Sequence, residues 1–71
     1  MISMNKIYVG IKIKFIKDTI VFEKDTGNTH VYVVNSVATI TKKFDKNNFM
    51  VDDRYFISKT SIKENTIDIY S

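Results

Sequence analysis

The sequence predicts an all-β fold, and three observations support this prediction. The odd positions from Ile7 to Phe15 are all apolar, whereas positions 8, 10, 12 and 14 hold Tyr, Gly, Lys and Lys. Strand side chains alternate between two faces, so this period of two indicates a half-buried β-strand over residues 7–17. Turn-forming residues then separate several further stretches that are rich in β-branched and aromatic residues. Finally, no long helical period occurs anywhere in the chain.

Length and composition predict a single small domain. The chain has 71 residues and no Cys, so we expect neither a disulfide nor a thiolate metal site. The one His cannot form a zinc site alone, and we expect no cofactor. We therefore expect one domain over residues 1–71, with 1–5 loosely ordered. The missing Cys, the lack of a signal-peptide pattern and the lack of a membrane-length apolar run predict a cytoplasmic protein without a membrane partner.

Two hairpins are expected after the first strand. The first hairpin is predicted from the turn-forming segment Lys24–Asn28, in which Gly27 can take a positive φ. Its two strands are residues 20–23 and 29–34. Residues 37–44 and 49–51 flank the polar turn at 45–48 and predict a second. Asp52 and Asp53 indicate a bulge or tight bend, after which 54–58 either continue the strand or open a new one.

The end of the chain predicts one helical turn and a last strand. Ser61 and Glu64 have the spacing of a capping box. Only a few residues remain before the alternating segment 66–70, so we expect about one turn of 3₁₀ helix. The resulting order resembles an SH3-like barrel of five to six strands with a 3₁₀ turn before the last strand. An OB-like barrel is the alternative, and the lack of a longer helix disfavours it.

The alternation also predicts which side chains form the core. A shift of one residue would invert a strand, so this prediction depends on register. The expected core residues are Ile7, Val9, Ile11, Ile13, Phe15, Ile20, Phe22, Val31, Val33, Ala38, Ile40, Phe49, Val51, Ile57, Ile62, Ile67 and Ile69.

Residues capable of catalysis occur without the partners that catalysis requires. A general base needs a nucleophile, an orienting group or a metal, and none can be assigned to His30, so a surface His is expected. Adjacent strand residues face opposite ways, so Asp52 and Asp53 are read as a solvated bend that pairs with Arg54 or a nearby Lys. We therefore expect no enzymatic activity.

Binding is the remaining class of function. The net charge is +3 and the chain holds nine aromatic residues, four Tyr and five Phe. A protein partner is expected, because exposed aromatic residues are common anchors of protein interfaces. The Ile-, Lys- and Asn-rich composition suggests an AT-rich genome, and a phage- or mobile-element-encoded inhibitor or adaptor fits it. The expected partner-binding residues are Tyr8, Lys12, Lys14, Tyr32, Lys42, Lys43 and Tyr55.

Two alternatives stay open. Small barrels also bind nucleic acid by combining basic side chains with stacked rings, and Lys and Tyr of the first strand and second hairpin would serve this purpose. A homodimer through the final strand, with Tyr70 at its end, is the other alternative.

Overall fold

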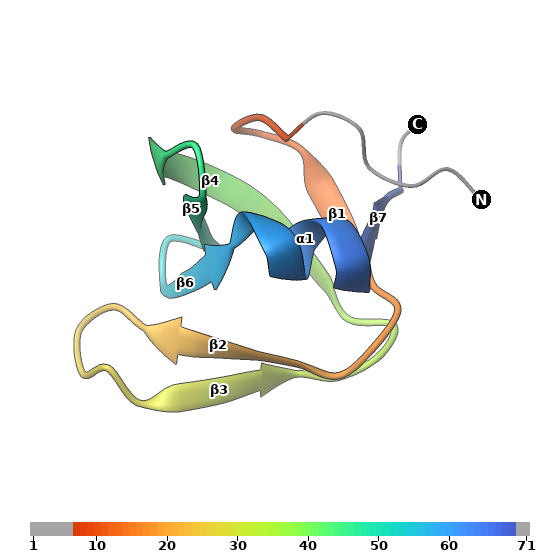
Figure 1. The fold of residues 1–71 in the computed structure, drawn as a ribbon. Coiled ribbons are helices and arrows are strands. Elements are labelled where there is room, and N and C mark those ends of the chain that lie inside the picture. The colour runs from red at the N-terminus through yellow and green to blue at the C-terminus, as the bar shows by residue number, and fades with distance from the viewer. Residues whose placement is uncertain (1–6, 70–71) are drawn as a thin grey trace.

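The computed structural model describes residues 7–69, which form seven strands and one helix (Figure 1). The strands join in one antiparallel sheet of order β3-β2-β6-β5-β4-β1-β7. The expected loose segment 1–5 and Tyr70 lie outside the described residues. The elements are β1 (Lys12–Phe15), β2 (Thr19–Glu23), β3 (Thr29–Tyr32), β4 (Val37–Asp45), β5 (Asn48–Val51), β6 (Tyr55–Ser58), α1 (Lys59–Asn65) and β7 (Thr66–Asp68).

The long strand β4 belongs to both halves of this curled sheet (Figure 1). Its first residues pair with β1, for example Val37 with Lys14, and its last residues pair with β5, for example Lys43 with Phe49. Two register shifts in the β4–β5 ladder bend the strand between these partners. The expected all-β, barrel-like fold is confirmed. The strand count is seven rather than five to six, because residues 55–58 form a separate strand, β6.

The first strand is shorter than its sequence pattern predicted. A turn at Val9–Gly10 precedes β1, and Gly10 has φ +97°, a conformation that glycine adopts without steric cost. The amide of Gly10 donates to the carbonyl of Ile40 at 2.7 Å, so this segment still runs beside β4. Ile11, Ile13 and Phe15 are buried as expected. Val9, expected in the core, is exposed, and Ile7 packs against the core only partly.

The first hairpin has the opposite facing from the one expected. Ile20, Phe22, Val31 and Val33 were predicted to be buried, but all are exposed. The inward residues are instead Thr19, Val21 and Tyr32. Both faces of these strands carry apolar residues, so alternation alone does not choose between two registers one residue apart. The Tyr32 ring decides the outcome, because it stacks on Phe15 at a centroid distance of 4.6 Å.

The second hairpin, β6 and the helix complete the core much as expected. The predicted residues of this region that are buried are Ala38, Ile40, Phe49, Val51, Ile57 and Ile62. Met50 is also buried, although it was not predicted to be. Ile67 and Ile69 are only half-buried.

The helical turn is an α-helix of seven residues, not the expected 3₁₀ turn. Its N-cap is Ser58, whose hydroxyl accepts a hydrogen bond from the Ser61 amide at 3.1 Å, so the predicted capping box at Ser61 and Glu64 is wrong. Ile62, which is fully buried, anchors α1 to the core. None of the helical structure within residues 7–69 has the length and apolar character needed to cross a bilayer.

Candidate functional site

A row of apolar side chains lies exposed on the outer face of the sheet. It consists of Ile20 and Phe22 on β2, Phe56 on β6 and Phe44 on β4, with exposed fractions of 60%, 51%, 38% and 46%. We call these four residues the outer apolar surface. Phe22 pairs with Phe56 across the β2–β6 ladder, and the rings of Phe44 and Phe56 meet edge to face at 5.3 Å. The largest contiguous apolar patch on a protein surface often marks an interaction site.

Strand alternation places Ile20, Phe22 and Phe56 outside because their neighbours are buried inside. Val21 is buried, so Ile20 and Phe22 on either side of it point outward. Ile57 likewise points inward and Phe56 outward. Phe44 extends the row near the end of β4, beyond the register shift that follows Ile40. The outward facing of Ile20, Phe22 and Phe56 therefore follows from the packing of the core, whereas Phe44 joins the row through its ring contact with Phe56.

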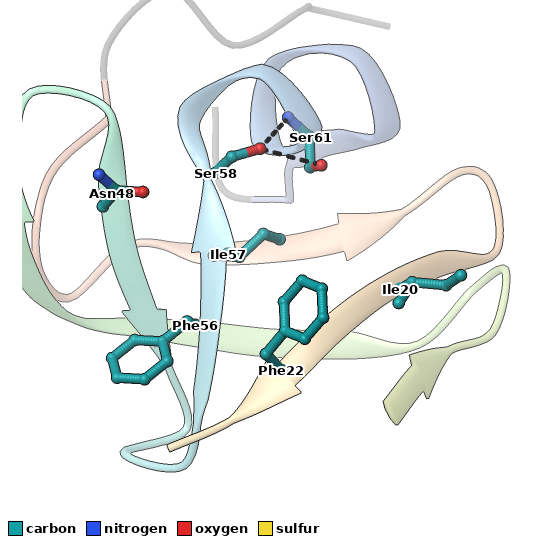
Figure 2. Close-up of a pocket in the computed structure, with 7 residues that line it drawn as sticks. All are labelled: Ile20, Phe22, Asn48, Phe56, Ile57, Ser58 and Ser61. Atoms are coloured by element: carbon teal, nitrogen blue, oxygen red, sulfur yellow. Dashed lines mark hydrogen bonds between the residues drawn. The ribbon is translucent and has the colours of Figure 1, made fainter. Parts of the chain in front are cut away.

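A shallow pocket opens beside this surface, with a volume of about 180 Å³ (Figure 2). Apolar side chains line one part of it and polar side chains the other. The lining residues are Ile20, Phe22, Asn48, Phe56, Ile57, Ser58 and Ser61. Pockets for free small molecules usually measure about 300–1,000 Å³. This pocket is smaller, and its size suits one side chain of a larger partner.

The polar residues of the pocket already have partners in the chain. The Ser58 hydroxyl donates to Ser61 Oγ at 3.1 Å and accepts from the Ser61 amide (Figure 2). Asn48 Nδ2 donates to both carboxylate oxygens of Asp45, at 3.1 and 3.0 Å. The exposed apolar side chains Ile20, Phe22 and Phe56 are therefore the part of the pocket that offers new contacts.

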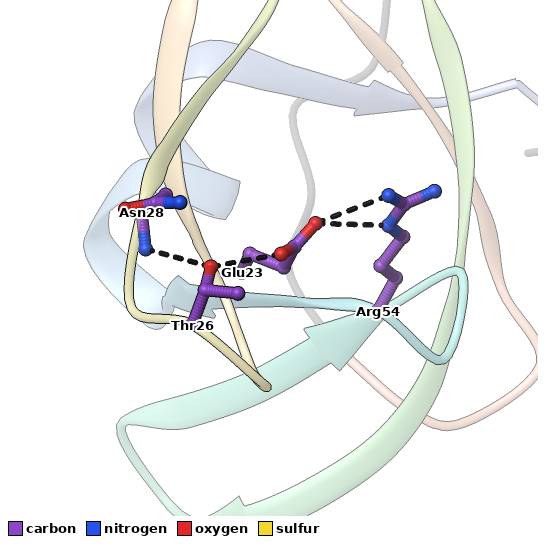
Figure 3. Close-up of polar contacts among 4 residues, drawn as sticks. All are labelled: Glu23, Thr26, Asn28 and Arg54. Carbon is purple, nitrogen blue, oxygen red and sulfur yellow. Dashed lines mark hydrogen bonds and ion pairs between the residues drawn. The ribbon is translucent and has the colours of Figure 1, made fainter.

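Two carboxylates near the outer apolar surface, those of Glu23 and Asp45, accept hydrogen bonds from neighbouring residues. Glu23 accepts from Thr26 at 2.8 Å and from two nitrogens of Arg54 at 3.2 and 3.1 Å (Figure 3). The Thr26 hydrogen bond, followed by that of Arg54, lowers the pKa of Glu23. The hydrogen bond from the Asn47 amide, followed by that from Asn48, lowers the pKa of Asp45.

The ammonium group of Lys42 has no carboxylate partner among the described residues. Within residues 7–69, the Glu23–Arg54 pair is the only ion pair. Lys42 lies beside the outer apolar surface, with Nζ 5.5 Å from the centroid of the Phe44 ring, in cation–π contact. The surface therefore combines apolar side chains with an ammonium group that no described carboxylate neutralises.

The predicted basic and aromatic residues do not form one site. Lys12 is exposed on β1, whereas Lys14 is half-buried, and these two residues pair with Thr39 and Val37 at the beginning of β4. Tyr8 is 52% exposed and precedes the Val9–Gly10 turn. Lys42 and Lys43 lie farther along β4, opposite Met50 and Phe49. Successive strand residues face opposite sides, so these two lysines do not share a face.

The prediction of Tyr32 as a surface residue is wrong. Its side chain is buried with 8% exposure, and its hydroxyl donates to Oδ2 of Asp52 at 2.6 Å. Burial, followed by this hydrogen bond to the carboxylate, raises the pKa of Tyr32. Tyr55 is half-buried between rings, since it stacks on His30 at 4.4 Å and meets Tyr32 edge to face at 5.6 Å.

The exposed His30 and the two aspartates have structural partners. His30 stacks on Tyr55, in addition to being at the surface as expected. Asp52 and Asp53 form a bend, each with φ 55°, but the expected pairing with Arg54 is wrong. Asp52 instead accepts hydrogen bonds from Tyr32 and from the Thr39 amide. The Asp53 amide donates to Thr41 Oγ1 at 3.0 Å.

No cluster of three or more His, Cys, Asp or Glu residues suited to a metal ion occurs in the described part of the chain. Comparisons with models of known protein families, with curated proteins and with solved structures find no significant match.

Sequence reasoning missed most of the outer apolar surface. Ile20 and Phe22 were assigned to the core, and Phe44 was given no role. One signal could have found Phe44, because it follows Lys42 and Lys43 and precedes Asp45, a setting typical of an exposed strand end. For Ile20 and Phe22 the sequence offers no such signal. Thr19 and Glu23 alternate with Val21 and mark the face that is in fact buried as the more polar one.

Proposed function

We propose that this chain is a non-catalytic interaction module that binds a protein partner through the outer apolar surface. One observation carries the proposal, namely the contiguous row of Ile20, Phe22, Phe56 and Phe44 beside a pocket of side-chain size. Aromatic and aliphatic anchors that enter small pockets supply most of the binding energy of many protein interfaces.

The chemistry of the surface indicates what the partner should offer. Apolar walls formed by Ile20, Phe22 and Phe56 favour a single aliphatic or aromatic side chain in the pocket. Lys42, at the edge of the row, favours a carboxylate nearby. We therefore expect a partner segment that combines an apolar anchor with acidic residues. The net charge of +3 would also attract such a partner from a distance.

Nucleic-acid binding is less well supported. Base stacking requires free rings beside basic side chains, but Tyr32 is buried and Tyr55 already contacts His30 and Tyr32. Tyr8 and Lys12 remain exposed, and they define the surface that an oligonucleotide would use.

The proposal extends to the type of barrel and the biological setting. The order β7-β1-β4-β5-β6, with a helix directly before the returning strand β7, supports an SH3-like arrangement. The composition supports a cytoplasmic inhibitor or adaptor encoded by a phage or mobile element.

The test compares two variants of matched exposure. The parent protein and the variants Phe22→Ser and Tyr8→Ser are each used to capture proteins from a host extract. The two variants are matched because Phe22 and Tyr8 are 51% and 52% exposed. Any protein retained in stoichiometric amount is purified, and its affinity for each variant is measured by calorimetry. We expect Phe22→Ser to weaken binding by about tenfold or more, the effect of removing one anchor, and Tyr8→Ser to leave it unchanged.

A parallel titration addresses nucleic acid. Fluorescence anisotropy at low salt with single- and double-stranded oligonucleotides should show no binding. Salt-dependent binding that Tyr8→Ser and Lys12→Ser abolish, with Phe22→Ser unaffected, would overturn the proposal in favour of the nucleic-acid alternative. Unfolding curves of each variant confirm that a loss of binding is not a loss of fold.

A further inference from the structure

The strand β3 forms one end of the seven-stranded sheet order. It pairs with β2 through Ile20–Val31 and Phe22–Thr29, and no strand within residues 7–69 pairs with its other side. Such an edge presents backbone N–H and C=O groups that can pair with another strand. Proteins usually protect edges of this kind with Lys, Pro, bulges or short length.

The strand β3 is short, with four residues, but none of the other protections occurs along it. Residues 29–34 read THVYVV and contain no Lys, Arg, Asp, Glu or Pro, although 27% of the whole chain is charged. Val31 and Val33 are 47% and 56% exposed. The other terminal strand, β7, differs in carrying a charged residue. It has three residues, and one of them is the charged Asp68.

We propose that two copies of this chain associate by antiparallel pairing of their β3 edges. A strand that pairs with its own copy about a two-fold axis is self-complementary, so one surface suffices for both partners. Two copies that each carry a net charge of +3 repel one another. This repulsion is weakest where the segments that meet carry no charged side chain, and β3 meets this condition.

The pairing also covers apolar area next to the edge. Val31 lies opposite Ile20 on the outer face, so it continues the outer apolar surface up to the edge of the sheet. In the dimer, the Val31 side chains of both copies approach the two-fold axis. The two outer apolar surfaces then lie on one continuous sheet, which would present a bivalent face to a partner.

The first test measures the oligomeric state and needs no partner protein. Sedimentation velocity of the purified chain over a wide concentration range should show a monomer–dimer equilibrium. Val31→Lys places two ammonium groups close together at the edge and should raise the dissociation constant by about tenfold or more. Val37→Lys is the matched control, because Val37 has a similar exposure, 49%, but lies on β4, away from the β3 edge. This variant should dimerise like the parent protein.

The second test uses the absence of Cys in the chain. Single Cys substitutions at Thr29, Val31 and Val33 are oxidised under mild conditions, with Lys63→Cys on α1 as the control. A disulfide requires close Cα atoms, so cross-linking should peak at position 31, nearest the two-fold axis, and be absent at position 63.

Three results would overturn the pairing. They are a monomer at every concentration, a dimer that Val31→Lys leaves intact, and equal cross-linking at all four positions. A dimer lost in Phe56→Ser but retained in Val31→Lys would assign the contact to the outer apolar surface instead. None of these results depends on a foreign partner, so the proposed function is judged separately by its own capture experiment.

Discussion

The Tyr32 hydroxyl donates a 2.6 Å hydrogen bond to Oδ2 of Asp52, and Oδ1 of the same carboxylate accepts from the Thr39 amide at 3.0 Å. Asp52 thereby joins β3, β4 and the bend between β5 and β6. Its φ of 55° is sparsely populated by residues other than glycine, and aspartate is among those that tolerate it. These two hydrogen bonds give a physical reason for an acidic residue at the bend.

Loss of the Tyr32–Asp52 hydrogen bond should destabilise the fold. Tyr32→Phe keeps the ring on Phe15 and removes only the hydroxyl, so we expect the free energy of unfolding to fall by about 1–2 kcal/mol. Urea unfolding followed by circular dichroism measures this change, with Tyr8→Phe as an unaffected control. In the Asp52→Ala background the same substitution should cost much less. An equal cost in both backgrounds would show that the hydrogen bond contributes nothing.

Truncation of two neighbouring residues of β2 should lower the free energy of unfolding by very different amounts. Val21 is fully buried, and Val21→Ala should lower the free energy of unfolding by about 2 kcal/mol through lost burial and a small cavity. Ile20 is 60% exposed, and Ile20→Ala should change it by less than about 0.5 kcal/mol, although it removes more atoms. Denaturant midpoints of the two variants measure the difference. The reverse ranking would mean that the hairpin has the register first expected from its sequence.

The helix should depend on Ser58 rather than Ser61. Ser58→Ala removes the acceptor of the Ser61 amide and should lower the free energy of unfolding by about 1 kcal/mol. Ser61→Ala leaves that amide in place and gains helix propensity, so it should be close to neutral. Thermal unfolding of both variants distinguishes the two serines. A larger loss for Ser61→Ala would restore the capping box as the start of the helix.

Acid should destabilise the protein partly through Glu23 and Asp45. Their hydrogen bonds hold both pKa values below the ordinary 4.5 and 3.8, so the carboxylates bind protons more weakly in the folded chain than in the unfolded chain. The stabilisation is complete above these ordinary values and is lost as the pH falls through the lower folded values.

The pH dependence can be assigned with one variant. Glu23→Gln removes a titrating group, so the decline in stability below about pH 4.5 should become shallower than in the parent. Unfolding midpoints measured between neutral and acidic pH give both slopes. Glu64→Gln, at an exposed position of α1, is the control. Identical slopes for the parent and Glu23→Gln would remove Glu23 from this explanation.

The sequence predicted the strand-and-turn framework well where only one face could be buried. Ile11, Ile13 and Phe15 alternate with Lys12 and Lys14, and a lysine on the inner face would be costly, so the register had one solution. The turn at Gly27 was equally clear, and this residue indeed has φ +74°.

Prediction failed where both faces offered apolar residues. In β2 and β3 the choice between Ile20 and Val21, or between Val31 and Tyr32, depends on contacts with β1 and the β5–β6 bend, which are distant in sequence. The candidate site was mispredicted for the same reason, because inverting this hairpin moved Tyr32 inward and Ile20 and Phe22 outward.

The pairing of β1 with β7 also has a kinetic consequence. Phe15 pairs with Thr66 and Ile13 with Asp68, so this ladder joins segments from opposite ends of the described chain, whereas β4, β5 and β6 pair with their sequence neighbours. Closing the longer loop costs more chain entropy, so we expect the β4–β6 meander to be ordered in the folding transition state and β7 to dock afterwards. Substitutions in β7 should then accelerate unfolding while leaving the folding rate almost unchanged.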